Sequence, residues 1–129
     1  MSISNYVAIV TALVLASSSL CNGCTHEIRI HVDKLPNIPS HTRDVVFNCD
    51  TGGLIIAFAD SESDHRFNIS VDKPEGCSAL WANKVAYFSA YDPHYDRGNA
   101  IIYWWAKLDG FYHSWDRVHW VKKACWGFD

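Results

Sequence analysis

The sequence predicts an all-β fold: a small antiparallel β-sandwich, braced by disulfide bonds, that follows an N-terminal signal peptide. Two observations indicate the sandwich. Apolar and polar residues alternate with a period of two through most of the chain. Turn-forming residues separate the alternating segments at short intervals, and no segment shows a convincing helical period. The length of 129 residues is typical of one domain, and a small barrel is the second choice of architecture.

Residues 1–23 have the layout of a signal peptide. They contain no charged side chain, and the apolar run YVAIVTALVLA at 6–16 is followed by three serines. The run is shorter than the ~20 apolar residues of a membrane-spanning helix. We therefore expect a secreted, extracellular protein without a membrane span, whose single domain covers residues 24–129. Cleavage after Cys21 is the alternative to cleavage after Gly23.

The charge of the chain excludes some classes of partner. All 11 Lys and Arg and all 14 Asp and Glu lie beyond residue 23, so the formal charge of −3 belongs to the expected domain. Nucleic-acid binding relies on a positive patch, and attraction to a membrane surface does too. We expect neither kind of partner.

The cysteine count fits an oxidising compartment. Beyond residue 23 the chain keeps Cys24, Cys49, Cys77 and Cys125, an even number that suggests a disulfide framework with three possible connectivities. Cys49 and Cys77 enclose a central segment, and we expect them to form a disulfide. Cys24 and Cys125 lie near the two ends and form the weaker, second expected bond. Zinc binding is the rival explanation, but no C-x-x-C pair remains once Cys21 is removed.

Eight segments are expected to form strands. In HEIRIHV at 26–32, Ile28, Ile30 and Val32 point to one face, as a strand with one buried face requires. The other expected strands cover residues 44–49, 54–59, 66–71, 84–91, 100–106, 111–115 and 117–123. The intervals between them, including 50–53, 60–64, 72–76 and 92–99, are rich in turn-forming residues.

The segment WWAKLDGFYHSW at 104–115 concentrates aromatic rings around an Asp-Gly pair. We expect a hairpin whose turn uses Asp109 and Gly110, residues that tolerate positive φ. Most rings of such a small domain build the core. The rings at 103–105 are consecutive, however, so at least one of them is expected on the outer face.

Five short motifs occur in a fixed order: FNC at 47–49, CSALW at 77–81, FSAYD at 88–92, Trp105 with LDGFY at 108–112, and Trp126. With the expected signal peptide, this order and spacing resemble the plant self-incompatibility S-protein homologue family over roughly residues 26–126. The resemblance implies a secreted plant β-sandwich, often glycosylated, whose founding members act as stigma signals recognised by pollen. It also implies that Cys49 and Cys77 match the family's disulfide, and that its structural turn is matched by Trp105, Asp109, Gly110 and Tyr112.

Residues 68–70, Asn-Ile-Ser, form an N-glycosylation sequon. The strand pattern places Asn68 on the outward face, so both sequence and geometry permit a glycan. We expect Asn68 to carry one.

Catalytic and metal chemistry find little support in the sequence. His26 and His31 are an odd number of residues apart on one strand and point in opposite directions. His113 and His119 lie on neighbouring expected strands and are the one pair suited to a metal or to acid–base chemistry, although surface histidines are the favoured interpretation. The sequence has no G-x-S-x-G elbow and no phosphate-binding glycine loop. We expect no enzyme activity, no metal and no cofactor.

The sequence therefore predicts a secreted protein whose loops carry its function in cell–cell signalling, with a cell-surface receptor or other extracellular protein as partner. The candidate partner-binding residues are Asp60, Glu62, Asp64, His94, Tyr95, Arg97, Trp115, Asp116 and Arg117. For Trp115, packing within a strand is an equally weighted alternative. A carbohydrate-binding module with exposed Trp and Tyr rings is the alternative function, and a small secreted hydrolase is a further one.

Overall fold

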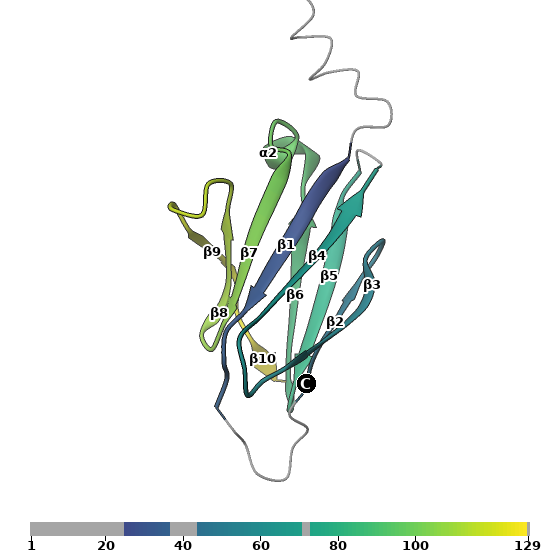
Figure 1. The fold of residues 1–129 in the computed structure, drawn as a ribbon. Coiled ribbons are helices and arrows are strands. Elements are labelled where there is room, and N and C mark those ends of the chain that lie inside the picture. The colour runs from purple at the N-terminus through teal and green to yellow at the C-terminus, as the bar shows by residue number, and fades with distance from the viewer. Residues whose placement is uncertain (1–24, 37–43, 71–72, 129) are drawn as a thin grey trace, which may run out of the picture.

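The protein is a sandwich of two five-stranded sheets in a computed structural model, which describes residues 25–36, 44–70 and 73–128 (Figure 1). The first sheet has the order β4 (Ser63–Ile69), β1 (His26–Val32), β7 (Ile101–Lys107), β8 (Gly110–Ser114) and β9 (Val121–Ala124). The second has the order β10 (Gly127–Phe128), β6 (Lys84–Tyr91), β5 (Glu75–Trp81), β2 (Asp44–Cys49) and β3 (Gly53–Phe58). The expected all-β sandwich is confirmed; the expected signal peptide lies outside the described residues.

Strand pairing is antiparallel except at the centre of the first sheet. There β1 and β7 run parallel, with Ile30 opposite Trp104. Between β1 and β7 the chain forms β2, β3, β5 and β6 of the second sheet and returns once to the first sheet as β4. The short helix α2 (Pro93–Asp96) then joins β6 to β7 at one end of the sandwich (Figure 1). This helix, which the sequence analysis did not predict, begins where Asp92 accepts a hydrogen bond from the N–H of His94.

Most expected strands are present, and three have the expected bounds: 26–32, 44–49 and 84–91. The strands predicted at 54–59, 66–71, 100–106 and 111–115 are displaced by one to three residues. β5 was missed, because its small residues weaken the alternation and its first two residues were assigned to a loop. The strand expected at 117–123 is wrong for its first half, since β9 begins only at Val121.

Aromatic rings fill the space between the sheets. Phe47, Phe88 and Phe111 come from three different strands, and the ring centroids of Phe88 and Phe111 are 4.9 Å apart. Two indoles connect the sheets: Trp104 Nε1 donates to Ala90 O at 2.9 Å, and Trp126 packs on Phe111 at a centroid distance of 4.9 Å. Trp126 Nε1 also donates to Lys107 O at 2.9 Å, so both of these indole N–H groups have an acceptor.

The disulfide between Cys49 and Cys77 is confirmed. It joins β2 to β5 at directly opposed positions, with a Cα to Cα distance of 4.1 Å. The second expected bond is wrong in this structure, because Cys125 is an exposed free cysteine. Cys125 follows the last residue of β9, and Cys24 lies outside the described residues.

A buried carboxylate anchors the turn beside this disulfide. Glu75 is 2% exposed, and its Oε2 accepts hydrogen bonds from the backbone N–H groups of Thr51 and Gly52 at 2.6 and 3.1 Å. Asp50 in turn accepts a hydrogen bond from the N–H of Gly76 at 2.8 Å. The turn between β2 and β3 is therefore tied to the start of β5 by side chains of both segments, which satisfies polar groups that burial would otherwise penalise.

The hairpin of β7 and β8 differs slightly from the prediction. Lys107 pairs with Gly110, so the two turn residues are Leu108 and Asp109, and Gly110 opens the returning strand. Gly110 has a φ of 143°, and a side chain there would collide with the carbonyl oxygen of Ala124 in β9. A glycine is required at this position both for its backbone conformation and for the close approach of β9.

Candidate functional site

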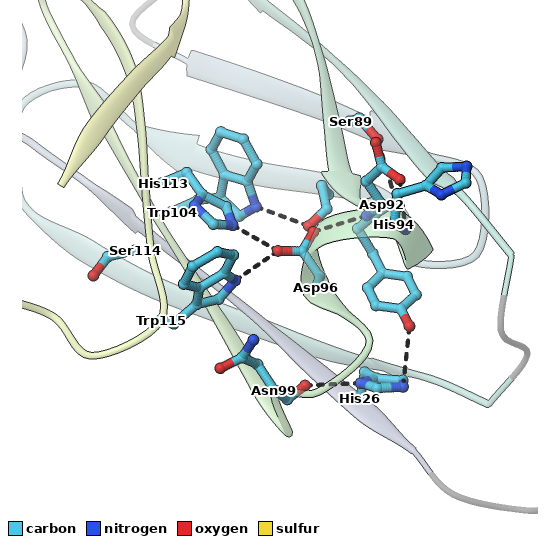
Figure 2. A network of polar contacts seen from close by, with 12 residues as sticks. His26, Ser89, Asp92, His94, Asp96, Asn99, Trp104, His113, Ser114 and Trp115 are labelled. Carbon is cyan, nitrogen blue, oxygen red and sulfur yellow. Dashed lines mark hydrogen bonds and ion pairs between the residues drawn. The ribbon is translucent and has the colours of Figure 1, made fainter. Parts of the chain in front are cut away.

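A buried aspartate joins the two loops at one end of the sandwich. Asp96, at the end of α2, is 2% exposed. Its Oδ1 accepts hydrogen bonds from His113 Nε2 at 2.8 Å and from Trp115 Nε1 at 2.7 Å, and its Oδ2 accepts one from the N–H of Asp92 at 2.8 Å (Figure 2). One carboxylate therefore holds α2, β8 and the residue after β8 together.

The surroundings of Asp96 favour its ionised form. Burial alone would raise the pKa of this carboxyl group, but the hydrogen bonds from His113, the Asp92 backbone and Trp115 outweigh burial and lower the pKa below its ordinary value. A carboxylate with this many donors is charged at neutral pH, so its hydrogen bonds are of the stronger, charge-assisted kind.

A second carboxylate shapes the segment that follows β8. Asp116 Oδ1 accepts hydrogen bonds from the backbone N–H groups of Val118 and His119, and Asp116 Oδ2 accepts one from His119 Nδ1 at 2.6 Å. These bonds, led by that from the His119 backbone, lower the pKa of Asp116. Ser114 Oγ accepts hydrogen bonds from the N–H groups of Asp116 and Arg117 as well. The backbone donors that a strand would use are thus bound locally, which explains why 117–120 is a turn.

The structure brings two of the predicted binding segments together. Residues of the loop at 92–99 and of the segment at 113–117 line one groove of about 410 Å³. We call the exposed candidate residues of these two segments, apart from Arg117, the loop surface: His94, Tyr95, Arg97, Trp115 and Asp116. Tyr95 is 71% exposed and Trp115 is 46% exposed. Trp115 lies just after β8, and its indole N–H is bound to Asp96 while part of its ring is accessible. Its role in partner binding stays a prediction.

The remaining predicted residues lie elsewhere. Asp60 is in the turn before β4, and Asp64 is not a loop residue at all, because it lies on β4 and accepts a hydrogen bond from His31 Nδ1 at 2.7 Å. Glu62 lies beside the same histidine, 3.8 Å from its Nε2. Arg117 points away from the loop surface, with its guanidinium carbon 5.5 Å from the ring centroid of Tyr103 in β7.

The histidines do not form the predicted pair. His113 is buried and bound to Asp96, so the expectation of a surface histidine is wrong for it, whereas His119 is exposed and bound to Asp116. Each ring thus has its own carboxylate. Ser114, next to His113, donates its hydroxyl to Asp116 and accepts two backbone N–H groups, so its oxygen is engaged in the turn.

Asn68 is exposed on β4, next to the buried Ile69. The predicted outward orientation of this sequon asparagine is confirmed. Its glycosylation stays a prediction.

The second sheet has an exposed apolar face that the sequence pattern did not predict. Val46 lies between Ile56 of β3 and Leu80 of β5 on the side away from the first sheet. Together with Leu54, which is 66% exposed, and Phe58, which is 60% exposed, these side chains form the apolar sheet face. The alternation of LIIAF is visible in the sequence, but it does not show that the small Ala57 faces the core while Leu54, Ile56 and Phe58 face outward. Exposed apolar patches often mark contacts with other molecules.

One small cluster has metal-ligating side chains. His31, Asp33 and Glu62 each offer a ligand atom, and these atoms lie within 4.8 Å of one another. Asp33 Oδ1 already accepts a hydrogen bond from Trp105 Nε1 at 2.6 Å, which accounts for its position without an ion.

The fold and these surfaces define a small, disulfide-braced β-sandwich with a loop surface organised by one buried aspartate. Comparison with models of known protein families gives no match, and no curated protein matches the sequence. A solved structure matches 81% of this chain and 96% of its own, with a TM-score of 0.55 and 17% sequence identity. It is described as the structure of SPH (Self-Incompatibility Protein Homologue) proteins, a widespread family of small, highly stable, secreted proteins from plants. The chain thus shares the fold of that protein, in agreement with the resemblance found in its motifs. Within the described residues, no helix has the length and apolar character needed to cross a membrane.

Proposed function

We propose that the chain is a small secreted plant protein that acts as an extracellular ligand and is recognised by a cell-surface receptor or other extracellular protein through its loop surface. Three features support secretion. The solved protein with the same fold is described as secreted. The Cys49–Cys77 disulfide suits an oxidising compartment. Residues 1–23 have the layout of a signal peptide.

The observation that carries the choice of surface is the position of Asp96. By binding both His113 and Trp115, it holds two segments that are distant in sequence as one surface with exposed Tyr95 and Trp115 at its centre. A surface held in one conformation loses less conformational entropy when it binds. Tyr and Trp are also enriched among the residues that contribute most to protein interfaces.

We also propose that the chain is not an enzyme. The arrangement around His113 supports a structural role, because its Nε2 is bound to a buried carboxylate and the neighbouring Ser114 hydroxyl is bound within a turn. A hydrolase of the Ser–His type needs the hydroxyl within reach of the histidine as base.

Binding to plant cells tests the proposal. The purified protein carries a fluorescent label on Cys125, which is exposed and lies at the end of β9 next to the β7–β8 hairpin, opposite the loop surface. We expect saturable binding that the unlabelled protein competes away, and a loss of about tenfold or more in affinity for Tyr95→Ala. The control is Leu54→Ala, which removes a side chain of similar exposure from the apolar sheet face and is expected to bind as the wild type does.

Two outcomes contradict this account. Binding that never saturates argues against a receptor. Weakening by Leu54→Ala without weakening by Tyr95→Ala places the contact on the apolar sheet face instead.

A further inference from the structure

A concave region lies on the outer face of the first sheet, away from the loop surface. It has a volume of about 630 Å³, and we call it the arginine groove, lined mainly by Arg29, Arg66, Tyr103, Trp105, Arg117 and Trp120. Its floor is formed by β4, β1 and β7, and the turn after β8 forms one wall. The volume is within the range of sites for small molecules, about 300 to 1,000 Å³.

Two guanidinium groups lie over one ring in this groove. The guanidinium carbon of Arg29 is 5.7 Å from the centroid of Tyr103, and that of Arg117 is 5.5 Å from it. An arginine that stacks on an aromatic ring keeps the N–H groups at its planar edge available, and these match the geometry of a carboxylate. The guanidinium groups of Arg29 and Arg117, both stacked on Tyr103, therefore offer two sets of N–H donors to a ligand in the groove.

The guanidinium groups have too few acidic partners of their own. Glu27 is 3.2 Å from Arg29 Nη2 and 3.9 Å from Arg66 Nη1, so these two arginines share one carboxylate. Among the described residues Arg117 makes no ion pair, and the buried Nε of Arg29 has no hydrogen-bond partner. A buried donor without a partner is costly unless a ligand or water satisfies it. The guanidinium N–H groups at this end of the groove can therefore bind an additional anion.

The other end of the groove has the opposite chemistry. His31 lies there with Asp33, Glu62 and Asp64 around it, and Asp64 is 83% exposed. Carboxylates accept hydrogen bonds and cannot donate them when ionised. This end favours hydroxyl groups and repels further negative charge. Burial lowers the pKa of the adjacent His65, so its ring adds no positive charge at neutral pH.

We propose that the arginine groove binds an oligosaccharide that carries a carboxylate group at one end, with that carboxylate at Arg29 and Arg117 and the hydroxyl groups toward Asp64. A sugar acid supplies both an anion and hydroxyl donors within a short length, which is what the two ends require. An acidic peptide would fit the arginine end but would meet repulsion at the acidic end. The partly exposed rings of Trp105 and Trp120, 5.2 Å apart, provide apolar surface for the carbon faces of the sugar.

This site is separate from the loop surface. Trp115 faces Asp96, whereas Arg117 and Trp120 of the same turn face the arginine groove. Changes at Arg117 therefore leave the contacts of Asp96 in place, and the groove can be tested independently of the proposed receptor contact.

Calorimetric titration of the purified protein tests the proposal, with a short neutral oligosaccharide that ends in one galacturonic acid residue as the probe. We expect saturable binding that weakens as salt is added, because the contact is between charges. The methyl ester of the same oligomer keeps the sugar rings but lacks the charge, and it is expected to bind at least tenfold more weakly. Arg117→Gln and Arg66→Gln, both at exposed positions, are each expected to weaken binding of the acid by roughly tenfold or more. Lys73→Gln removes the same charge from an exposed residue that does not line the groove and is expected to have no effect.

The results separate the sources of the anion. Equal binding of the acid and its methyl ester overturns the proposal, as does tighter binding of a sulfated oligosaccharide. Poly-glutamate that binds as well as the sugar acid overturns it too, in favour of an acidic peptide partner. A loss of binding in both Lys73→Gln and Arg117→Gln identifies a nonspecific charge effect and also contradicts the site.

Discussion

Trp115 donates its indole N–H to Asp96 Oδ1 at 2.7 Å, across 19 positions of sequence that include the hairpin of β7 and β8. The same oxygen binds His113 at 2.8 Å. Asp96 therefore links the loop after β6 to the turn after β8, and we expect the stability of this end of the sandwich to depend on its charge and on its acceptor atoms.

Asp96→Asn tests this dependence. The amide keeps the size of the side chain but replaces one acceptor oxygen by a donor, so at least one of the N–H groups around it loses its partner. We expect a loss of about 2 kcal/mol in the free energy of unfolding, measured by chemical denaturation at neutral pH. Asp60→Asn makes the same chemical change at an exposed turn position and is expected to change stability by less than about 0.5 kcal/mol. Equal losses in both variants would show that net charge, rather than the Asp96 contacts, sets stability.

The contribution of Asp96 also depends on pH. Because its hydrogen bonds lower its pKa in the folded protein below the ordinary value of 3.8, the unfolded chain takes up this proton more readily. The stabilisation is complete above about pH 5 and is lost as the pH falls through the unfolded pKa toward the folded one. The difference in unfolding free energy between wild type and Asp96→Asn is therefore expected to shrink below about pH 4. A difference that stays constant down to pH 3 would contradict the assignment. Asp109 and Asp116 also have lowered pKa values, and both remain in the two proteins compared.

Glu75, at the start of β5 in the second sheet, allows a second test of how a buried carboxylate contributes to stability. Replacing it by Leu leaves the N–H groups of Thr51 and Gly52 without an acceptor, and we expect a loss of about 2 kcal/mol in the free energy of unfolding. Glu75→Gln keeps an acceptor oxygen and is expected to lose clearly less. If the Gln and Leu variants are equally unstable, then the negative charge and not the hydrogen bonds determines the role of Glu75.

The disulfide closes a loop of sequence separation 28 between β2 and β5. Replacing Cys49 and Cys77 together by Ala is expected to lower the free energy of unfolding by about 3 to 4 kcal/mol, since the unfolded chain gains the entropy of the opened loop. Denaturation of wild type with and without reducing agent provides the matched comparison. A wild type whose stability does not respond to reduction would show that the bond contributes little.

The sequence predicted the strands best where alternation is strict and residues are large. Ile28, Ile30 and Val32 all lie in the core as expected. It failed at β5, where Gly76, Cys77 and Ser78 are small and give a weak pattern. Tertiary pairing with β2 and β6 makes that segment a strand, and such pairing is invisible in a local pattern.

The candidate site could be predicted only in part for a similar reason. The exposed Tyr95 lies in the segment 92–99, whose composition predicts a loop, whereas the exposed Trp115 follows β8 although the alternation predicts it as the last residue of a strand. Asp96 and the sharing of one carboxylate by His113 and Trp115 depend on which loops meet in space, and the arginine groove depends on the neighbouring positions of β1 and β7 in a parallel pair. A single sequence contains no pattern that shows which of these distant residues are in contact.

Secretion is the central claim, and the intact mass of the protein released by plant cells tests it most directly, before and after glycosidase treatment and after labelling of free thiols. The account predicts a chain that lacks residues 1–23, carries a glycosidase-sensitive glycan on Asn68, retains the Cys49–Cys77 disulfide and takes up label at Cys125. A full-length chain that stays inside the cell with Cys49 and Cys77 reduced would contradict it.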